Sequence, residues 1–134
     1  MSLAVKYRPT SFDQVLGQGK VIKSLTAALA RPLVTQKAWL LVGPPGTGKT
    51  TVARLIAAHF TKGCLGPGNL LEINAASNTG VDDMRNVISQ AHYKAIGASP
   101  VKVVVLDEAH RLTGNAWDSL LKPIEEPLPH CYWI

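Results

Sequence analysis

The sequence predicts an α/β domain built on a mostly parallel sheet with helices on its faces, and three observations support this prediction. Stretches with the apolar pattern of strands alternate with stretches of helical spacing, an order typical of βαβ units. A glycine-rich loop at 43–50 stands between a predicted strand and a predicted helix. A run of four apolar residues at 103–106 ends in two carboxylates, Asp107 and Glu108. The crossovers between parallel strands are expected to be right-handed.

Length and composition fit one soluble domain. The chain has 134 residues, enough for a single hydrophobic core. No apolar run has the length of a membrane span and no secretory segment opens the chain, so we expect a cytoplasmic protein. The formal net charge of +5 is compatible with a nucleic-acid partner without demonstrating one. Cys64 and Cys131 are far apart and form no C-x-x-C pair, so neither a disulfide nor structural zinc is expected.

Strands are predicted where short apolar runs stand between turn residues, and helices where apolar residues recur at helical spacing. The segment 1–18 contains Pro9 and is expected to be an irregular arm with four buried anchors, Tyr7, Phe12, Val15 and Leu16. The expected strands are 38–42, 70–74, 103–106 and the start of a strand at 132–134. The expected helices are 20–30, 51–60, a helix that begins at 79–82, and 114–124.

Two of these helices carry more specific expectations. Thr79 and Asp82 match the capping-box pattern S/T-x-x-D/E and should start the third helix. The fourth helix is expected to be buried through Trp117, Leu120 and Leu121, and the prolines that follow it should end it.

The loop 43–50 fits the phosphate-binding template G-x-x-x-x-G-K-S/T. Its glycines let backbone N–H groups turn toward phosphate oxygens, and the following helix adds a favourable dipole. Lys49 is expected to reach the β- and γ-phosphates, and the Thr50 hydroxyl to hold Mg²⁺. The alternative, a glycine-rich turn that binds nothing, is disfavoured because the motif is complete and correctly flanked. The expected nucleotide-binding residues of the loop are Gly43, Pro44, Pro45, Gly46, Thr47, Gly48, Lys49, Thr50 and Thr51.

A second half-site follows the strand at 103–106. Ligands of open α/β sheets bind at the carboxyl ends of the strands, where Asp107 and Glu108 are expected. Asp107 is placed to hold Mg²⁺, and Glu108 to polarise the attacking water. Two acidic residues in a solvated loop are the alternative, which the buried strand and the complete phosphate loop upstream disfavour.

With both motifs in view, the chain resembles AAA+ ATPases of the clamp-loader type, in particular the tau/gamma subunits of bacterial DNA polymerase III. The resemblance rests on both nucleotide motifs and on the segments 7–18, 72–85, 107–112 and 120–127. It implies an ATPase that couples ATP to the loading of a sliding clamp onto primer–template DNA. It also implies partner subunits in an assembly of five. Residues 1–134 would then be the N-terminal portion of the ATPase domain, with an adenine-pocket arm at 1–18 and the core at 19–134.

The resemblance further assigns roles to single residues. Tyr7, Arg8, Val15 and Leu16 would help to form the adenine pocket, although Val15 and Leu16 could equally be packing residues. Asn74 would hold Glu108 inactive, although an asparagine at a strand end is also a common turn former. The positions that would follow DNA are Asn78, Thr79, Gly80 and Lys122, of which the lysine could simply be solvated.

The chain departs from the family pattern in two ways. Only Cys64 stands where the bacterial subunits usually carry a four-cysteine zinc module. The family's sensor residue, Ser-Arg-Cys arginine finger, helical lid and fourth strand are expected beyond Ile134, in a sheet of order 2-3-4-1-5. We therefore expect a fragment that binds nucleotide and hydrolyses it barely above background. Two other functions stay open, a nucleotide-binding scaffold without turnover and another DNA-processing AAA+ ATPase.

Overall fold

From residue 49 onward, helical segments and strands alternate along the chain, as the sequence predicts. The computed structural model describes residues 8–15, 19–30, 37–44 and 47–134. The helices and strands are η1 (Phe12–Gln14), α2 (Gly19–Leu29), α3 (Lys49–Thr61), β1 (Leu70–Asn74), α4 (Val81–His92), β2 (Lys102–Asp107), η2 (Ala109–Arg111), α5 (Gly114–Glu125) and β3 (Cys131–Trp133). None of the helices in these ranges is long and apolar enough to cross a membrane.

The three strands form one parallel sheet in the order β1-β2-β3. Val105 of β2 lies opposite Glu72 of β1, and Val104 lies opposite Trp133 of β3. On the other side of β3, Ala38 forms a single parallel bridge with Trp133. Cys131–Trp133 therefore already occupies the place between the strand of Asp107 and the segment before the phosphate loop. The expectation that the fourth strand lies wholly beyond Ile134 is wrong, whereas the expected start of a strand at 132–134 is confirmed.

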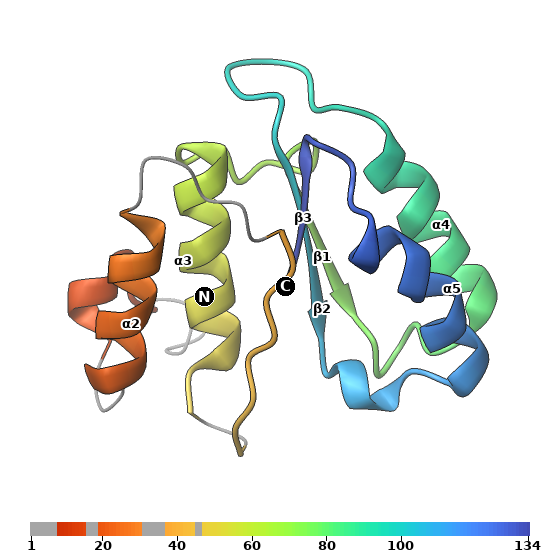
Figure 1. The fold of residues 1–134 in the computed structure, drawn as a ribbon, viewed down its shortest axis with the longest axis horizontal. Coiled ribbons are helices and arrows are strands. Elements are labelled where there is room, and N and C mark those ends of the chain that lie inside the picture. Colours follow the sequence, from red (N-terminus) through yellow and green to blue (C-terminus); the bar gives the residue numbers. More distant parts are fainter. Residues whose placement is uncertain (1–7, 16–18, 31–36, 45–46) are drawn as a thin grey trace.

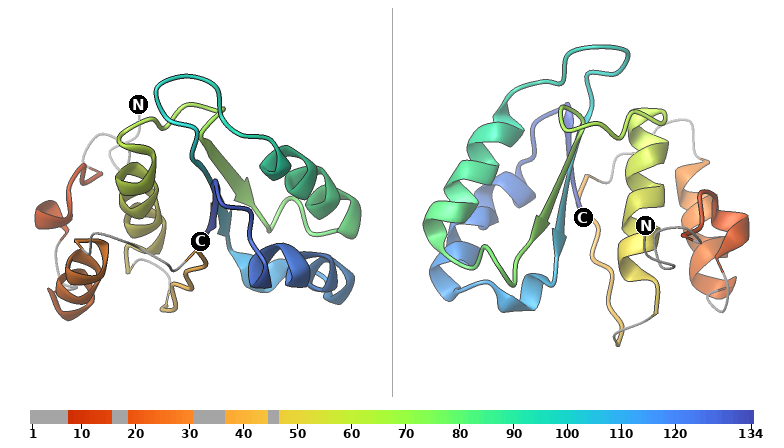
Figure 2. Two further views of the ribbon diagram at one scale, coloured as in Figure 1. Left: turned by 45° about the horizontal axis from the view of Figure 1, so that its top comes forward. Right: turned by 180° about the vertical axis from the view of Figure 1, so that it is seen from behind.

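The molecule is layered, with the sheet between two groups of helices (Figures 1 and 2). Helix α3 covers one face of the sheet, and α2 packs on the outer side of α3 through Leu25, Leu29, Val52 and Ile56. Helices α4 and α5 cover the other face, where Met84 and Leu120 are fully buried. Because β2 has helices on both faces, its residues Val103 to Val105 are buried without a polar alternation.

The side chains of β2 alternate between the two faces of the sheet. Val103 and Val105 pack with Ala53 and Ala57 of α3. Val104 packs with the α4–α5 group and with Cys131. Burial raises the pKa of the Cys131 thiol to about 11, so this cysteine stays protonated near neutral pH and serves as a small packing residue.

The N-terminal arm is described only in part. Phe12 begins the short turn η1 and packs against the contact between α2 and α3. Pro9 and Val15 are half-buried. Two of the four expected anchors, Tyr7 and Leu16, lie outside the described residues.

The segment 38–42 does not form the short buried strand that its apolar run predicts. Leu40 and Val42 are 81% and 84% exposed. The backbone pairs with β3 only around Trp39, whose N–H donates to the Trp133 carbonyl at 2.8 Å. The N–H of Ile134 donates instead to Val104 on β2, at 2.9 Å. Within the described residues no strand continues alongside Leu40 to Val42, so the extended segment has no ladder to join.

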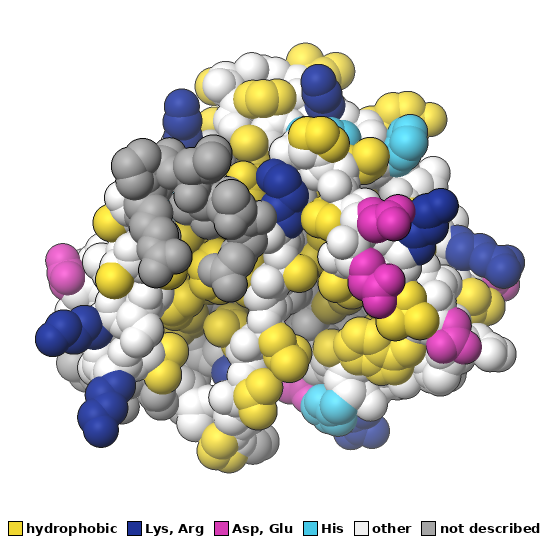
Figure 3. Space-filling model, in the orientation of Figure 1, with side chains coloured by type: hydrophobic (Ala, Val, Ile, Leu, Met, Phe, Trp, Pro, Cys, Tyr) yellow, Lys and Arg dark blue, Asp and Glu magenta, His cyan; other side chains and the backbone are white. Residues whose placement is uncertain are grey.

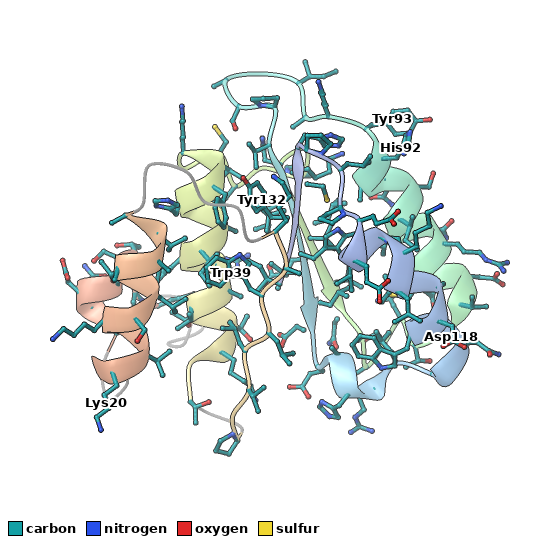
Figure 4. All side chains as sticks on the ribbon, viewed as in Figure 1. Lys20, Trp39, His92, Tyr93, Asp118 and Tyr132 are labelled. Carbon is teal, nitrogen blue, oxygen red and sulfur yellow. The ribbon has the colours of Figure 1, made fainter. Side chains whose placement is uncertain are left out.

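Aromatic contacts hold the paired part of this segment in place. Trp39 and Tyr132 lie between α3 and β3 (Figure 4). The Tyr132 ring stacks on Phe60 of α3, with centroids 3.9 Å apart, and Trp39 packs on the same Phe60 at 6.2 Å. The Lys37 ammonium lies 4.3 Å from the centre of the Tyr132 ring. These contacts position the chain just before the phosphate loop.

The capping box of α4 is shifted by one residue from the prediction. The N-cap is Gly80, and its N–H donates to Asp83 Oδ2 at 3.3 Å. The other half of the box is missing because glycine has no side chain to accept from the backbone. Thr79 instead offers its carbonyl to the N–H of Thr113, at 3.0 Å, and this bond ties the start of α4 to the start of α5.

The buried face of α5 also differs from the expected one. Ala116 and Leu120 are fully buried, as residues four apart on one helix face should be. Trp117 and Leu121 are 36% and 54% exposed, so of the three expected anchors only Leu120 is correct. Thr113 caps the helix by accepting the N–H of Ala116, at 3.2 Å, which sets the rotation of the first turn.

Truncation of neighbouring leucines on α5 should separate these two faces. Leu120→Ala should lower the free energy of unfolding by about 2–5 kcal/mol, because it leaves a cavity in the core between the sheet, α4 and α5. Leu121→Ala, the matched control, should change it by less than about 0.5 kcal/mol. Urea denaturation of both variants measures the difference. Equal losses would contradict the described rotation of α5.

Candidate nucleotide-binding site

The glycine-rich loop leads directly into α3. Gly48 has φ 87° and ψ 19°, a left-handed conformation that suits glycine, and it is the N-cap of the helix. A Cβ atom on Gly43 would lie 3.0 Å from Thr47 Oγ1, so a side chain there would press on the loop. Thr47 Oγ1 donates to the Pro44 carbonyl at 2.8 Å. Pro45 and Gly46 lie outside the described residues. The first N–H groups of α3 are thus available to an anion.

Lys49, the first residue of α3, folds back over the loop. Its ammonium donates to the Gly43 carbonyl and lies 3.5 Å from the Pro44 carbonyl. Carbonyl oxygens of the loop therefore surround the one charged group that the template places here. An incoming phosphate oxygen would compete with these carbonyls for the same ammonium, and a bond between two oppositely charged groups is stronger than one to a neutral carbonyl.

Thr50 joins the phosphate loop to the end of β2. Its Oγ1 donates to Asp107 Oδ2 at 3.0 Å. The two residues are 57 positions apart in the sequence, and both are partly buried. The sequence-predicted metal pair, Thr50 and Asp107, is thus brought together by the fold.

Glu108 follows Asp107 in an unusual backbone conformation. Its φ of 58° and ψ of 41° are left-handed, which a residue with a side chain adopts only under constraint. The Glu108 N–H donates to Asp107 Oδ1 at 3.0 Å, so both oxygens of Asp107 accept hydrogen bonds. Beyond Glu108 the chain enters the short helix η2. The Glu108 carboxylate lies beside His110, with Oε2 3.4 Å from Nε2.

The oxygens at this point suit Mg²⁺. Magnesium binds hydroxyl, carboxylate, water and phosphate oxygens, and proteins usually supply only one or two of its ligands. Thr50 Oγ1 and Asp107 Oδ2 converge at the N-terminus of α3, next to Lys49. In the described ranges, no group of three or more His, Cys, Asp or Glu side chains is placed to hold a metal by itself. A Mg²⁺ ion held by this pair would therefore also need phosphate oxygens and water.

Two cavities flank the loop. The larger, of about 560 Å³, lies between the segment 38–43 and the end of β2 and reaches Lys49, Thr50, Asp107 and Glu108. The smaller, of about 420 Å³, lies between α2 and the loop and is lined by Val21, Val52 and Lys49 among others. In the orientation of Figure 1, hydrophobic side chains gather near the centre of the molecular surface, between the α2–α3 side and the α4–α5 side (Figure 3). Phosphate-binding groups thus stand where two largely apolar spaces meet.

The Asn74 side chain forms a hydrogen bond within the turn that follows β1. Its side-chain Oδ1 accepts the N–H of Ala76 at 3.0 Å, and its carbonyl accepts the Asn78 side chain at 3.1 Å. Although Asn74 lies opposite Asp107 in the sheet register, its described hydrogen bonds do not include Glu108. The turn-forming alternative therefore has direct support, and the restraining role of Asn74 stays a prediction.

The other predicted site residues are not gathered at the loop. Arg8 and Val15 are half-buried and line neither cavity, and Tyr7 and Leu16 lie outside the described residues. Asn78 and Thr79 lie just before α4, whereas Lys122 is exposed about two turns along α5 from its start. The adenine-pocket and DNA assignments therefore stay predictions.

The structure adds residues that pattern reasoning missed. Val21 of α2 is 49% exposed and lines the smaller cavity. His110 lines the larger cavity and lies beside Glu108. The sequence could have pointed to His110, because this histidine stands two residues after Glu108.

The glycine-rich loop that leads into α3, the lysine at the helix start and the bonded threonine–aspartate pair define a P-loop nucleotide-binding domain. The chain belongs to the AAA family of ATPases, because the family model described as "ATPase family associated with various cellular activities (AAA)" matches residues 39–127. The resemblance to clamp-loader proteins is confirmed, because the chain is similar in sequence to subunits of DNA polymerase III and Replication factor C.

DNA polymerase III subunit tau of Bacillus subtilis is 36% identical over an alignment of 146 residues. The alignment covers 96% of this chain and 26% of that protein. The Replication factor C small subunit of Thermofilum pendens is 40% identical over 121 residues, which cover 90% of this chain and 36% of that protein. The RuvB Holliday junction branch migration motor of Thermotoga maritima has a TM-score of 0.67 at 29% identity, over 95% of this chain and 40% of that chain. The chain thus spans about a quarter to two-fifths of the length of these proteins.

Removal of the Lys49 ammonium should weaken nucleotide binding. Lys49→Ala should lower ATP affinity by about tenfold or more, because a charge-assisted hydrogen bond to phosphate contributes about 1.5–3 kcal/mol. Lys23→Ala, on the exposed side of α2, should bind as the wild type does. Isothermal titration calorimetry with ATP and Mg²⁺ compares the three proteins. Unchanged affinity of Lys49→Ala would contradict the assignment of the loop.

Proposed function

We propose that this chain binds ATP with Mg²⁺ and hydrolyses it as a subunit of a DNA sliding-clamp loader. The observation that carries the nucleotide part is the Thr50–Asp107 hydrogen bond, which brings a complete phosphate loop and a strand-end carboxylate to one point. The named relatives in DNA polymerase III and Replication factor C support the clamp-loading part. ATP, sliding clamp, primer–template DNA and partner subunits in a five-membered assembly are parts of this proposal, as is a cytoplasmic location.

Each residue of the site has a role that follows from its position. Lys49 exchanges the Gly43 and Pro44 carbonyls for phosphate oxygens and so draws the loop around the nucleotide. The N–H groups at the start of α3 bind the same phosphates. Thr50 and Asp107 would hold Mg²⁺, which supplies positive charge against the phosphate oxygens as the bond to the leaving group breaks. The adenine would lie toward the arm with Tyr7, Arg8, Val15 and Leu16.

Glu108 is the group that we assign to the attacking water. Its carboxylate lines the same cavity as Lys49 and Thr50, and it has no bond to either in the described structure. A carboxylate in this position accepts a hydrogen bond from water and takes up its proton as the oxygen attacks phosphorus. An arginine from a neighbouring subunit would add roughly 10³–10⁵ in rate, so turnover depends on assembly.

A second candidate function is the DNA-processing activity of a different AAA motor. The likeness to RuvB at 29% identity favours it, because it extends over nearly the whole chain. The two functions differ in what stimulates hydrolysis. A clamp together with primed DNA should stimulate a clamp-loader subunit, and branched DNA without a clamp should stimulate a branch-migration motor. A scaffold subunit would bind ATP without turnover under either condition.

Replacement of Glu108 by its amide should separate binding from hydrolysis. In the assembled complex, Glu108→Gln should keep ATP affinity within about twofold and lower kcat by about 10²-fold or more, because the amide cannot take up a proton. Asp118→Asn, an exposed change on α5 (Figure 4), should leave kcat unchanged. A steady-state phosphate-release assay gives these rates.

The same assay applied to the 134-residue chain alone should give hydrolysis barely above background. Brisk hydrolysis by the isolated chain would contradict the dependence on a neighbouring subunit. A fully active Glu108→Gln complex would remove Glu108 from the role proposed for it.

A further inference from the structure

His110 faces the carboxylate of Glu108. Its Nε2 lies 3.4 Å from Glu108 Oε2, and both residues line the larger cavity together with Lys49 and Thr50. A carboxylate only accepts hydrogen bonds, so the ring can donate to Glu108 through Nε2 when this nitrogen carries the proton. The histidine is therefore part of the wall of the nucleotide site, two residues beyond the paired carboxylates.

The backbone between the two residues is shaped for this contact. Glu108 is one of two non-glycine residues in the described ranges with positive φ, and it is the N-cap of η2. Its carbonyl accepts the N–H of Arg111 at 3.0 Å, which closes the short turn. Because the backbone turns at Glu108, the strand ends there and the His110 side chain lies beside that of Glu108. A left-handed residue with a side chain is strained, and such residues cluster at functional sites where the surrounding structure holds them.

The Glu108–His110 contact is the last of three polar contacts that connect α3 to η2. Thr50 Oγ1 donates to Asp107 Oδ2, the Glu108 N–H donates to Asp107 Oδ1, and Glu108 Oε2 lies beside His110. Asn74 is not part of this series, because its side chain accepts from the Ala76 N–H. Among the described residues, the side chain that forms an ion-pair contact with the Glu108 carboxylate is that of His110.

We infer that His110 is a positioning residue that holds Glu108 Oε2 and thereby orients the other carboxylate oxygen toward the attacking water. This inference rests on the proposed hydrolysis. The Glu108 side chain is 49% exposed and that of His110 69%, so the pair adds little to stability. Its effect is on geometry, and misplacement of a catalytic group by about 1 Å can lower a rate by about 10²-fold.

Three histidine variants of the assembled complex test the inference through steady-state kinetics. His110→Ala should lower kcat by about tenfold to a hundredfold and leave KM for ATP within about twofold, because no ground-state contact with nucleotide is removed. His110→Gln should recover most of the rate, since its amide nitrogen can donate from nearly the position of Nε2. His92→Ala, at the far end of α4 (Figure 4), should behave as the wild type does.

A spectroscopic comparison tests the contact without turnover. In ¹⁵N–¹H spectra of the ligand-free chain, Glu108→Gln should move the ring signals of His110 and leave those of His92 in place. Unchanged His110 signals, or an unchanged kcat in His110→Ala beside an active wild type, would overturn the inference alone. A wild-type complex without ATP turnover would contradict the proposed function and the inference with it.

Discussion

The hydrogen bond between Thr50 and Asp107 is the interaction on which the site depends. It connects the first turn of α3 to the carboxyl end of β2, across 57 positions of sequence, and so fixes the phosphate loop against the sheet. Because α3 packs on one face of β2 through Ala53 and Ala57, the bond does not act alone. The apolar contact sets how far α3 stands from the sheet, and the polar contact sets where along β2 the helix begins.

The central position of β2 follows from the same arrangement. It pairs with β1 on one side and β3 on the other, and helices cover both of its faces. The middle of a strand enclosed in this way is apolar, and its polar side chains stand at the two ends, Lys102 at the start and Asp107 at the carboxyl end. Asp107 and Glu108 stand at that point, so the core that stabilises the fold also delivers the carboxylates to the edge where ligands bind.

Much of this could be predicted from the sequence, because the predictable features are local. The bounds of β1, the apolar run of β2 and the phosphate-loop template each depend on neighbouring residues. Features that depend on a distant partner could not be predicted in the same way. The rotation of α5 is set by the Thr113 cap and by which side faces α4, so Leu120 is buried and Leu121 is exposed. His110 meets Glu108 only because the backbone turns left-handed between them, and no periodic pattern records such a turn.

The segment before the phosphate loop has a consequence for how the chain behaves in solution. Leu40 and Val42 are almost fully exposed on an extended backbone that is paired with β3 only near Trp39. An apolar extended edge of this kind is a template for strands from other molecules. Copies of the isolated chain should therefore associate edge to edge as the protein concentration rises. Polar replacement of these two side chains should keep the chain monomeric without touching the core, since neither belongs to a buried cluster.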